Sequence, residues 1–235
     1  MTPSGVARKG LGGPPKVSHL GERRGYDGRA GTGAREVSLK VAGMVLAAGR
    51  STRMGENKLV LRLGGESLIR RAVQAALEGG LDPVLVVLGH EAERVRAELA
   101  DLSYVPVPNP RHALGVNTSL DAAVASVPPD ADGAMVILAD MPLVTGPMIR
   151  SLVERARETR AAIVSARYGA VSAPPVLYAR ALFAELSGGV GEGRGREVVR
   201  RHAGEVEHVD LPESGLTDVD QAGDLERAAR RGGLA

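Results

Sequence analysis

From residue 41 onward, short apolar runs alternate with stretches in which apolar residues recur at helical spacing. This alternation is typical of a parallel sheet whose strands are joined by crossover helices. The pattern predicts strands over residues 42–47, 83–88, 104–107, 134–139, 162–165 and 206–209. It predicts helices over residues 68–77, 92–99, 118–126, 147–157, 179–186, 197–202 and 221–230. The expected fold is an α/β fold, a three-layer α/β/α sandwich around a mostly parallel, Rossmann-like sheet.

The first 40 residues lack this periodic pattern. They contain nine glycines and three prolines, and a segment of this composition buries too little apolar surface to offset the entropy lost on ordering. We therefore expect residues 1–38 to form a disordered tail, without the apolar core of a secretory signal. Residues 39–235 are expected to form one domain, because a chain of 235 residues with 43% hydrophobic content buries one substantial core.

The positive charge of the chain is concentrated in this tail. Residues 1–40 carry eight Lys or Arg and three Asp or Glu, whereas residues 41–235 carry 22 and 25, a net charge of −3. Only 2% of the residues are aromatic, so the predicted domain has neither a basic stripe nor a platform on which bases stack. We therefore expect no nucleic-acid binding by the domain.

The chain contains no cysteine, which excludes disulfides, thiolate metal ligands and cysteine nucleophiles. This composition is compatible with a reducing cytoplasm, and we expect a cytoplasmic protein. No apolar run approaches the length of about 18 residues that a membrane-spanning helix needs. We expect no contact with a membrane.

The most informative segment, LAAGRSTRMGENK, covers residues 46–58 and follows the first predicted strand. Backbone N–H groups in a small-residue loop after a strand form a concave anion site. Leu46, Ala47, Ala48 and Gly49 would let a triphosphate lie directly on the backbone. Arg50, Arg53 and Lys58 supply positive charge around this loop. Ser51 also lies within it. The segment therefore predicts a nucleotide-binding loop.

Two common phosphate-binding motifs do not fit this segment. The Walker motif requires Gly-Lys-Ser/Thr in sequence, but Glu56 and Asn57 separate Gly55 from Lys58. The dinucleotide-binding motif requires three glycines at fixed offsets, and the middle glycine is missing here. The loop is therefore expected to bind a nucleotide through a motif other than these two.

Asp140 follows the most apolar of the predicted strands, residues 134–139. In parallel α/β sheets, ligands bind beyond the carboxyl ends of the strands. The Asp140 carboxylate is a hard oxygen ligand that would hold Mg²⁺ against a triphosphate. An alternative is that Asp140 only begins the turn before Pro142.

Together these segments resemble the molybdenum cofactor guanylyl- and cytidylyltransferases, the MobA/MocA-like group of the nucleotidyltransferase (glycosyltransferase-A-like) fold. The resemblance implies that Lys58 and Arg53 contact phosphate in catalysis and that Asp140 acts as both a catalytic residue and a metal ligand. It also implies that Asp220 completes a Mg²⁺ site, within the sequence TDVDQAGDL of residues 217–225. Helix capping is the alternative role for Asp218 and Asp220.

A further stretch resembles the family segment that contacts base and ribose. It comprises Asn109-Pro110 and residues 115–120, GVNTSL, and implies that Asn109 and Ser119 bind the nucleotide. Capping of the following helix would equally explain Asn117 and Thr118. The segment at residues 173–196 resembles the acceptor half of the family, but Ala173 and Pro174 stand where Gly-His is usual.

The resemblance also implies a reaction. Cytidylyl-transferring members carry LAAG where guanylyl-transferring members carry LAGG, which favours CTP over GTP and molybdopterin as the phosphorylated acceptor. A molybdoenzyme or its chaperone would then be a partner. Two alternatives remain: transfer to a sugar- or polyol-phosphate, and a non-catalytic nucleotide-binding accessory protein for molybdoenzyme maturation.

Overall fold

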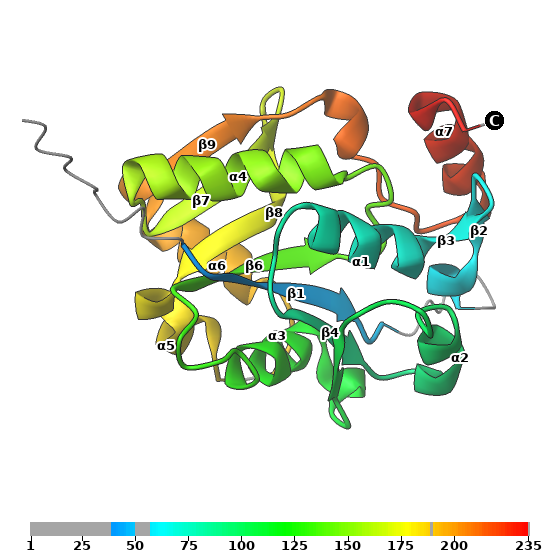
Figure 1. Cartoon of the computed structure of the whole chain (residues 1–235), viewed down its shortest axis with the longest axis horizontal. Coiled ribbons are helices and arrows are strands. Elements are labelled where there is room, and N and C mark those ends of the chain that lie inside the picture. Colours follow the sequence, from blue (N-terminus) through cyan, green and yellow to red (C-terminus); the bar gives the residue numbers. More distant parts are fainter. Residues whose placement is uncertain (1–38, 50–56, 189, 235) are drawn as a thin grey trace, which may run out of the picture. The chain divides into compact units, whose positions relative to one another are not determined.

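The structure is a computed structural model that describes residues 39–49, 57–188 and 190–234 (Figure 1). The strands are β1 (Val41–Ala47), β2 (Arg62–Leu63), β3 (Glu66–Ser67), β4 (Val84–Leu88), β5 (Val105–Pro108), β6 (Gly133–Leu138), β7 (Ile163–Tyr168), β8 (Val171–Ala179) and β9 (Val206–Asp210). The helices are α1 (Leu68–Glu78), α2 (Ala92–Ala97), α3 (Val116–Ala125), α4 (Gly146–Thr159), α5 (Phe183–Leu186), α6 (Arg194–Arg201) and α7 (Ala222–Gly232). The predicted tail, residues 1–38, lies outside the described residues.

The central sheet has seven strands in the order β5-β4-β1-β6-β8-β7-β9. All of its strands run in one direction except β8, which pairs antiparallel with both β6 and β7. The chain adds β4 and β5 on one side of β1 and then returns to place β6 on the other side. The predicted α/β fold with a mostly parallel sheet is confirmed, and the strand order reverses between β1 and β6.

Helices cover both faces of the sheet, as the alternation of side chains along β1 illustrates. Val41 and Val45 belong to an apolar cluster that includes residues of α1 and α4, whereas Ala42 and Met44 belong to a second cluster with α3, α5 and α6. Figure 1 shows α1 and α4 on one side of the sheet and α3 and α5 on the other. Alternate side chains of each central strand are thus buried under helices on opposite faces of the sheet, which gives the three layers.

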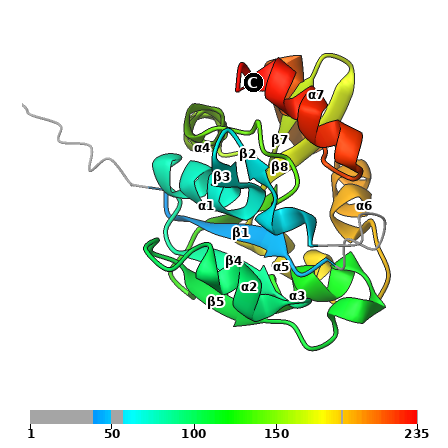
Figure 2. The same ribbon diagram turned by 90° about the vertical axis from the view of Figure 1, so that its right-hand side faces the viewer.

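A third apolar cluster lies between α7 and the β2–β3 hairpin, which are side by side in both Figure 1 and Figure 2. It joins segments that are distant in the sequence: the β2–β3 hairpin, the start of α1, the loop after β6, the segment before α7 and α7 itself. Its buried members are Leu63, Leu68, Leu143, Val219 and Ala228. This cluster connects the segments that carry the candidate site residues.

The prediction was wrong over residues 171–186, where β8 was missed and one helix was expected over residues 179–186. Residue 179 ends β8, Arg180–Leu182 form a 3-10 turn, and only Phe183–Leu186 are α-helical. Two prolines hide this strand, because proline lacks the N–H that a sheet ladder uses. Pairing with β7 passes from Ala173 directly to Val176, so the two prolines fall at the irregularity.

Among the residues that the structure describes, no helix has both the length and the apolar character needed to cross a membrane.

Candidate active site

A pocket of about 250 Å³ opens where β1 meets β6. Because β5, β4, β1 and β6 are parallel, the loops that follow them all leave from the same edge of the sheet. The pocket therefore lies at the reversal of strand order, where open α/β sheets bind ligands. Its lining residues are Leu46, Ala48, Gly49, Lys58, Leu59, Val116, Ser119, Leu138, Asp140 and Asp220.

Lys58 lies at the centre of this arrangement. It begins a short 3-10 turn, η1 (Lys58–Val60), and the side chain of Asn57 accepts a hydrogen bond of 3.1 Å from the N–H of Leu59. The Lys58 ammonium donates to Asp140 Oδ2 and to Asp220 Oδ1, each at 2.7 Å. Its side chain is only 14% exposed, against 27% for Asp140 and 49% for Asp220. One cation therefore bridges two carboxylates that are 80 residues apart in the sequence.

A backbone hydrogen bond brings the two aspartates together. The N–H of Val219 donates to the carbonyl oxygen of Asp140 at 3.0 Å, and the Val219 side chain is fully buried in the third cluster. The next residue, Asp220, lines the pocket. The buried Val219 side chain and this hydrogen bond therefore anchor Asp220 beside Asp140.

The capping role considered for Asp218 and Asp220 is wrong. Gln221 is the N-cap residue of α7. The carboxylate of Asp224 accepts hydrogen bonds of 2.8 Å from the N–H groups of Asp220 and Gln221. Asp224, rather than either earlier aspartate, satisfies the backbone at the start of this helix.

The local charges shift two pKa values. Burial alone would lower the pKa of Lys58, but the hydrogen bonds and charges of Asp140 and Asp220 outweigh it and raise this pKa. The pKa of Asp218 is raised by burial of its carboxyl group and then by the charges of Asp140 and Asp220. Three carboxyl groups thus share one small region.

These residues fit a divalent cation of the magnesium type. Magnesium in proteins is usually held by one or two carboxylates, with substrate phosphates and water completing the octahedron. Asp140 and Asp220 already converge on a single cation, the Lys58 ammonium. Within the described ranges, no group of three or more His, Cys, Asp or Glu side chains is arranged to hold a metal by itself. Two carboxylates, with the remaining positions filled by phosphate oxygens and water, match the ligands that magnesium usually has in proteins.

The predicted nucleotide-binding loop is described only in part. Leu46, Ala48 and Gly49 line the pocket, whereas the side chain of Ala47 is buried in the first cluster on the other face of the sheet. Gly49 and Lys58, on either side of residues 50–56, both reach the pocket. The segment that contains Arg50, Ser51 and Arg53 lies outside the described residues, and the roles of these three side chains stay predictions.

Asn109 and Ser119 occupy different positions. Ser119 lines the pocket, and Asn109 lies behind it, 3% exposed. The Asn109 amide donates to the hydroxyls of Thr118 and Ser119, each at 3.0 Å, and its carbonyl accepts from the N–H of Arg111. Asn109 therefore holds the first turn of α3 in place beneath the pocket wall.

The N-cap of α3 is Gly115, so the capping role considered for Asn117 and Thr118 is wrong. The Asn117 amide instead donates to the carbonyl of Val190 and accepts from the N–H of Arg194. Asn117 thus joins α3 to the loop before α6.

Sequence reasoning missed three apolar pocket residues, namely Leu59, Val116 and Leu138. Leu138 ends β6, so the rule that ligands bind beyond strand ends would have identified it. Val116 is 44% exposed, and nothing in the local sequence distinguishes it from a solvent-facing helix residue.

Comparison with known proteins agrees with this geometry. The sequence profile of the MobA-like NTP transferase domain matches residues 43–206. The chain belongs to the MobA-like NTP transferase family. The matched residues extend from β1 to the start of β9, and the family makes the protein a nucleotidyltransferase.

Two relatives cover most of the MobA-like chain. The purine catabolism protein PucB of Bacillus subtilis (strain 168) is 31% identical over 198 residues, covering 73% of this chain and 92% of PucB. The crystal structure of Rv0371c from Mycobacterium tuberculosis H37Rv has a TM-score of 0.74 and 27% identity, covering 82% of this chain and 99% of Rv0371c. A second Rv0371c structure, a complex with manganese, has a TM-score of 0.69 and 27% identity, covering 81% and 98%.

Proposed function

We propose that this MobA-like protein transfers CMP from CTP to the phosphate of a small-molecule acceptor, molybdopterin, and releases pyrophosphate with Mg²⁺ as cofactor. The observation that supports this most strongly is the ion-pair arrangement at the pocket. Lys58 Nζ lies 2.7 Å from a carboxylate oxygen of both Asp140 and Asp220. Two carboxylates and a lysine at the reversal of strand order are the groups that phosphoryl chemistry needs.

The proposed reaction needs no general base. An oxygen of the acceptor phosphate, which is already an anion, forms a bond to the α-phosphorus of CTP. The bond from this phosphorus to the β-phosphate oxygen breaks, and pyrophosphate carries away the electron pair. Catalysis then depends on in-line positioning and on cations near the transferring group.

Each charged residue has a distinct role in this proposal. Asp140 and Asp220 hold the divalent cation, which supplies positive charge at the phosphates when bound. Lys58, released from its carboxylate partners, follows the negative charge that develops on the α-phosphate. Arg53, from the segment outside the described residues, is proposed to hold the β- and γ-phosphates.

The identities of the base and of the acceptor rest on sequence features. Leu46-Ala47-Ala48-Gly49 follows the cytidylyl-transferring form of the loop, which supports CTP over GTP. The manganese complex of Rv0371c supports a divalent ion in a relative of the same fold. Ala173 and Pro174 depart from the usual acceptor motif, so molybdopterin is the part of the proposal that most needs a direct test.

Pyrophosphate release from the purified full chain tests the proposal. CTP and GTP are each supplied with Mg²⁺, with and without reduced molybdopterin, and in parallel with a sugar 1-phosphate and a polyol phosphate. We expect release only with CTP and molybdopterin together. Asp130→Asn is a matched control, because Asp130 pairs with Lys40 and does not line the pocket.

Each other outcome contradicts part of the proposal. Release with a sugar- or polyol-phosphate but not with molybdopterin would overturn the acceptor, and a preference for GTP would overturn the base. If neither CTP nor GTP releases pyrophosphate with any of the phosphorylated acceptors, the result would favour the non-catalytic accessory protein.

A further inference from the structure

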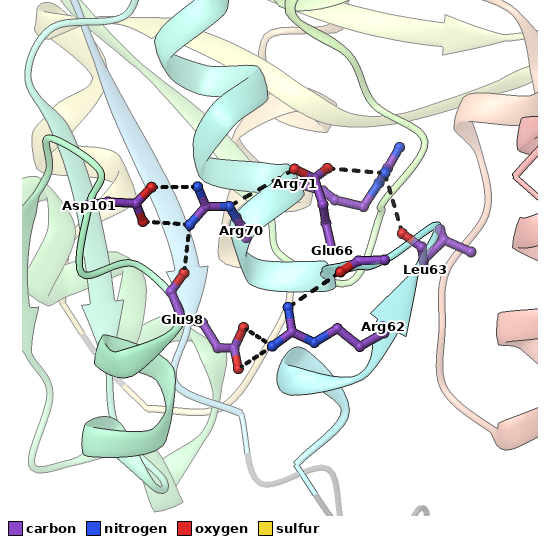
Figure 3. Close-up of polar contacts among 8 residues, drawn as sticks. Arg62, Leu63, Glu66, Arg70, Arg71, Glu98 and Asp101 are labelled. Carbon is purple, nitrogen blue, oxygen red and sulfur yellow. Dashed lines mark hydrogen bonds and ion pairs between the residues drawn. The ribbon is translucent and has the colours of Figure 1, made fainter.

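Two adjacent arginines on the first turn of α1, Arg70 and Arg71, both pair with Glu66, at 3.9 and 3.4 Å, and otherwise contact different segments (Figure 3). Arg70 forms a two-armed ion pair with Asp101, at 2.6 and 2.7 Å, and donates to the carbonyl oxygen of Glu98. These contacts tie α1 to the turn after α2. In Figure 3, Arg71 points the other way, toward Glu66 and Leu63.

Arg71 links the two segments that carry Lys58 and Asp140. Its Nε donates to the carbonyl oxygen of Pro142 at 3.2 Å, two residues after Asp140. Its Nη1 lies 3.4 Å from the carbonyl oxygen of Leu63 and 3.4 Å from Glu66 Oε2, in the hairpin that follows the Lys58 turn. The guanidinium therefore connects the backbone on both sides of the site.

The same two segments meet again in the apolar layer of the third cluster. Leu63 packs there with Leu143, the residue after Pro142, and with Val219, the residue before Asp220. Apolar packing resists separation of these segments but does not fix their register, whereas directed hydrogen bonds do. Arg71 adds that directional restraint, with a side chain that is only 20% exposed.

We propose that Arg71 is a positioning residue that sets the spacing between the Lys58 turn and the Asp140 loop. It touches neither nucleotide nor metal, and it acts by fixing where the carboxylate of Asp140 stands relative to the ammonium of Lys58. The inference rests on the proposed function, because its consequence is the geometry of the cation and phosphate site. Partners outside the ligand shell typically change metal affinity or activity by about tenfold to a hundredfold when mutated.

The decisive experiment compares Arg71→Met with Arg70→Met. Both variants remove one partly buried arginine from the same helix, and the shortest ion pair of the two residues, 2.6 Å, joins Arg70 to Asp101. For each variant of the full chain we would measure Mn²⁺ affinity by electron paramagnetic resonance, kcat and KM for CTP, and the melting temperature.

Arg71→Met is expected to weaken Mn²⁺ binding and lower kcat by about tenfold, with a smaller change in KM for CTP. Arg70→Met is expected to keep both parameters within about twofold of wild type while lowering the melting temperature, because its hydrogen bonds go to Glu98 and Asp101 and not to the Asp140 loop. Arg71→Lys, which retains the charge but replaces the planar fork by one ammonium, is expected to restore only part of the loss. It also serves as the test if Arg71→Met fails to fold.

Two different results would overturn the inference. If Arg71→Met and Arg70→Met have the same Mn²⁺ affinity and kcat while Asp140→Asn is inactive, the positioning role is wrong and the proposed function stands. If the wild-type chain neither binds Mn²⁺ nor releases pyrophosphate, the proposed function is wrong and the inference falls with it.

Discussion

The loop after β6 and the segment before α7 each present one aspartate to Lys58, but different contacts hold them in place. Asp140 lies two residues after the end of the buried strand β6, so the sheet itself sets its position. Asp220 has no strand behind it and depends on the hydrogen bond from Val219 to Asp140, on the burial of Val219, and on the Asp224 carboxylate. The first aspartate is positioned by the central sheet and the second by tertiary contacts.

This difference indicates where the site tolerates change. A substitution in the third cluster is expected to disturb Asp220 before it disturbs Asp140, because Val219 is the residue next to Asp220. It also indicates that Asp140 itself anchors Asp220, since its carbonyl oxygen accepts the Val219 hydrogen bond.

The largest effect is expected from Asp140→Asn, which removes a charge proposed to hold the divalent cation. Loss of metal-borne charge stabilisation is worth several kcal/mol, so kcat is expected to fall by about a hundredfold or more. Pyrophosphate release at saturating Mg²⁺ measures this. A kcat near that of wild type would remove Asp140 from the mechanism.

Lys58→Met is expected to separate two functions of one side chain. Turnover is expected to fall by about tenfold to a hundredfold, because a cation that follows the phosphate charge is lost. Binding of Mn²⁺ without nucleotide is expected to tighten, since the ammonium 2.7 Å from both carboxylates no longer competes with the ion. Mn²⁺ titration by electron paramagnetic resonance measures this, and unchanged or weaker binding would contradict the competition.

Val219→Ala is expected to act on Asp220 through packing. Removing two methyl groups from a fully buried position in the third cluster is expected to lower the free energy of unfolding by about 2 kcal/mol. We also expect kcat to fall severalfold while Val171→Ala, at a 48% exposed position, changes neither quantity. Urea unfolding and pyrophosphate release together measure this. Lost stability with an unchanged kcat would show that packing of Val219 does not position Asp220.

The smallest effect is expected outside both segments, at the Arg70–Asp101 pair. Hydrogen bonds from Arg70 lower the pKa of Asp101 from 3.8 to about 2. Because the folded-state pKa is lowered, the stabilisation is present above the ordinary pKa and is lost as the pH falls through the folded-state value. The difference in melting temperature between wild type and Asp101→Asn is therefore expected to shrink as the pH falls from about 4 to about 2. If this difference in melting temperature stays constant over that pH range, the Asp101 charge does not contribute to the stability of the Arg70–Asp101 pair.

The fold was largely predictable because its central strands are continuous apolar runs. Strands β1, β4 and β6 are buried on both faces, and such runs stand out without knowledge of their partners. Strand β8 was not predictable, because Pro174 and Pro175 remove two ladder donors. Only the irregular pairing with β7, a tertiary feature, makes these prolines compatible with the sheet.

The candidate site was predictable to a different degree at each position. Asp140 and Lys58 follow directly from strand ends and loops, which local sequence reveals. The convergence of Asp220 on them came from resemblance to a family, because the Val219 contact joins segments about 80 residues apart. Arg71 had no local signal at all, since its neighbour Arg70 has the same side chain and shares Glu66 as a partner, but only Arg71 donates to the carbonyl oxygen of Pro142.

The proposed chemistry depends most on one divalent cation being shared by Asp140 and Asp220. Crystals of the full chain grown with Mn²⁺ and CTP, measured at a wavelength where manganese scatters anomalously, test this directly. The account predicts an anomalous peak within coordination distance of a carboxylate oxygen of both residues and of the triphosphate. A manganese peak that contacts only one of the two aspartates, or neither, would contradict it.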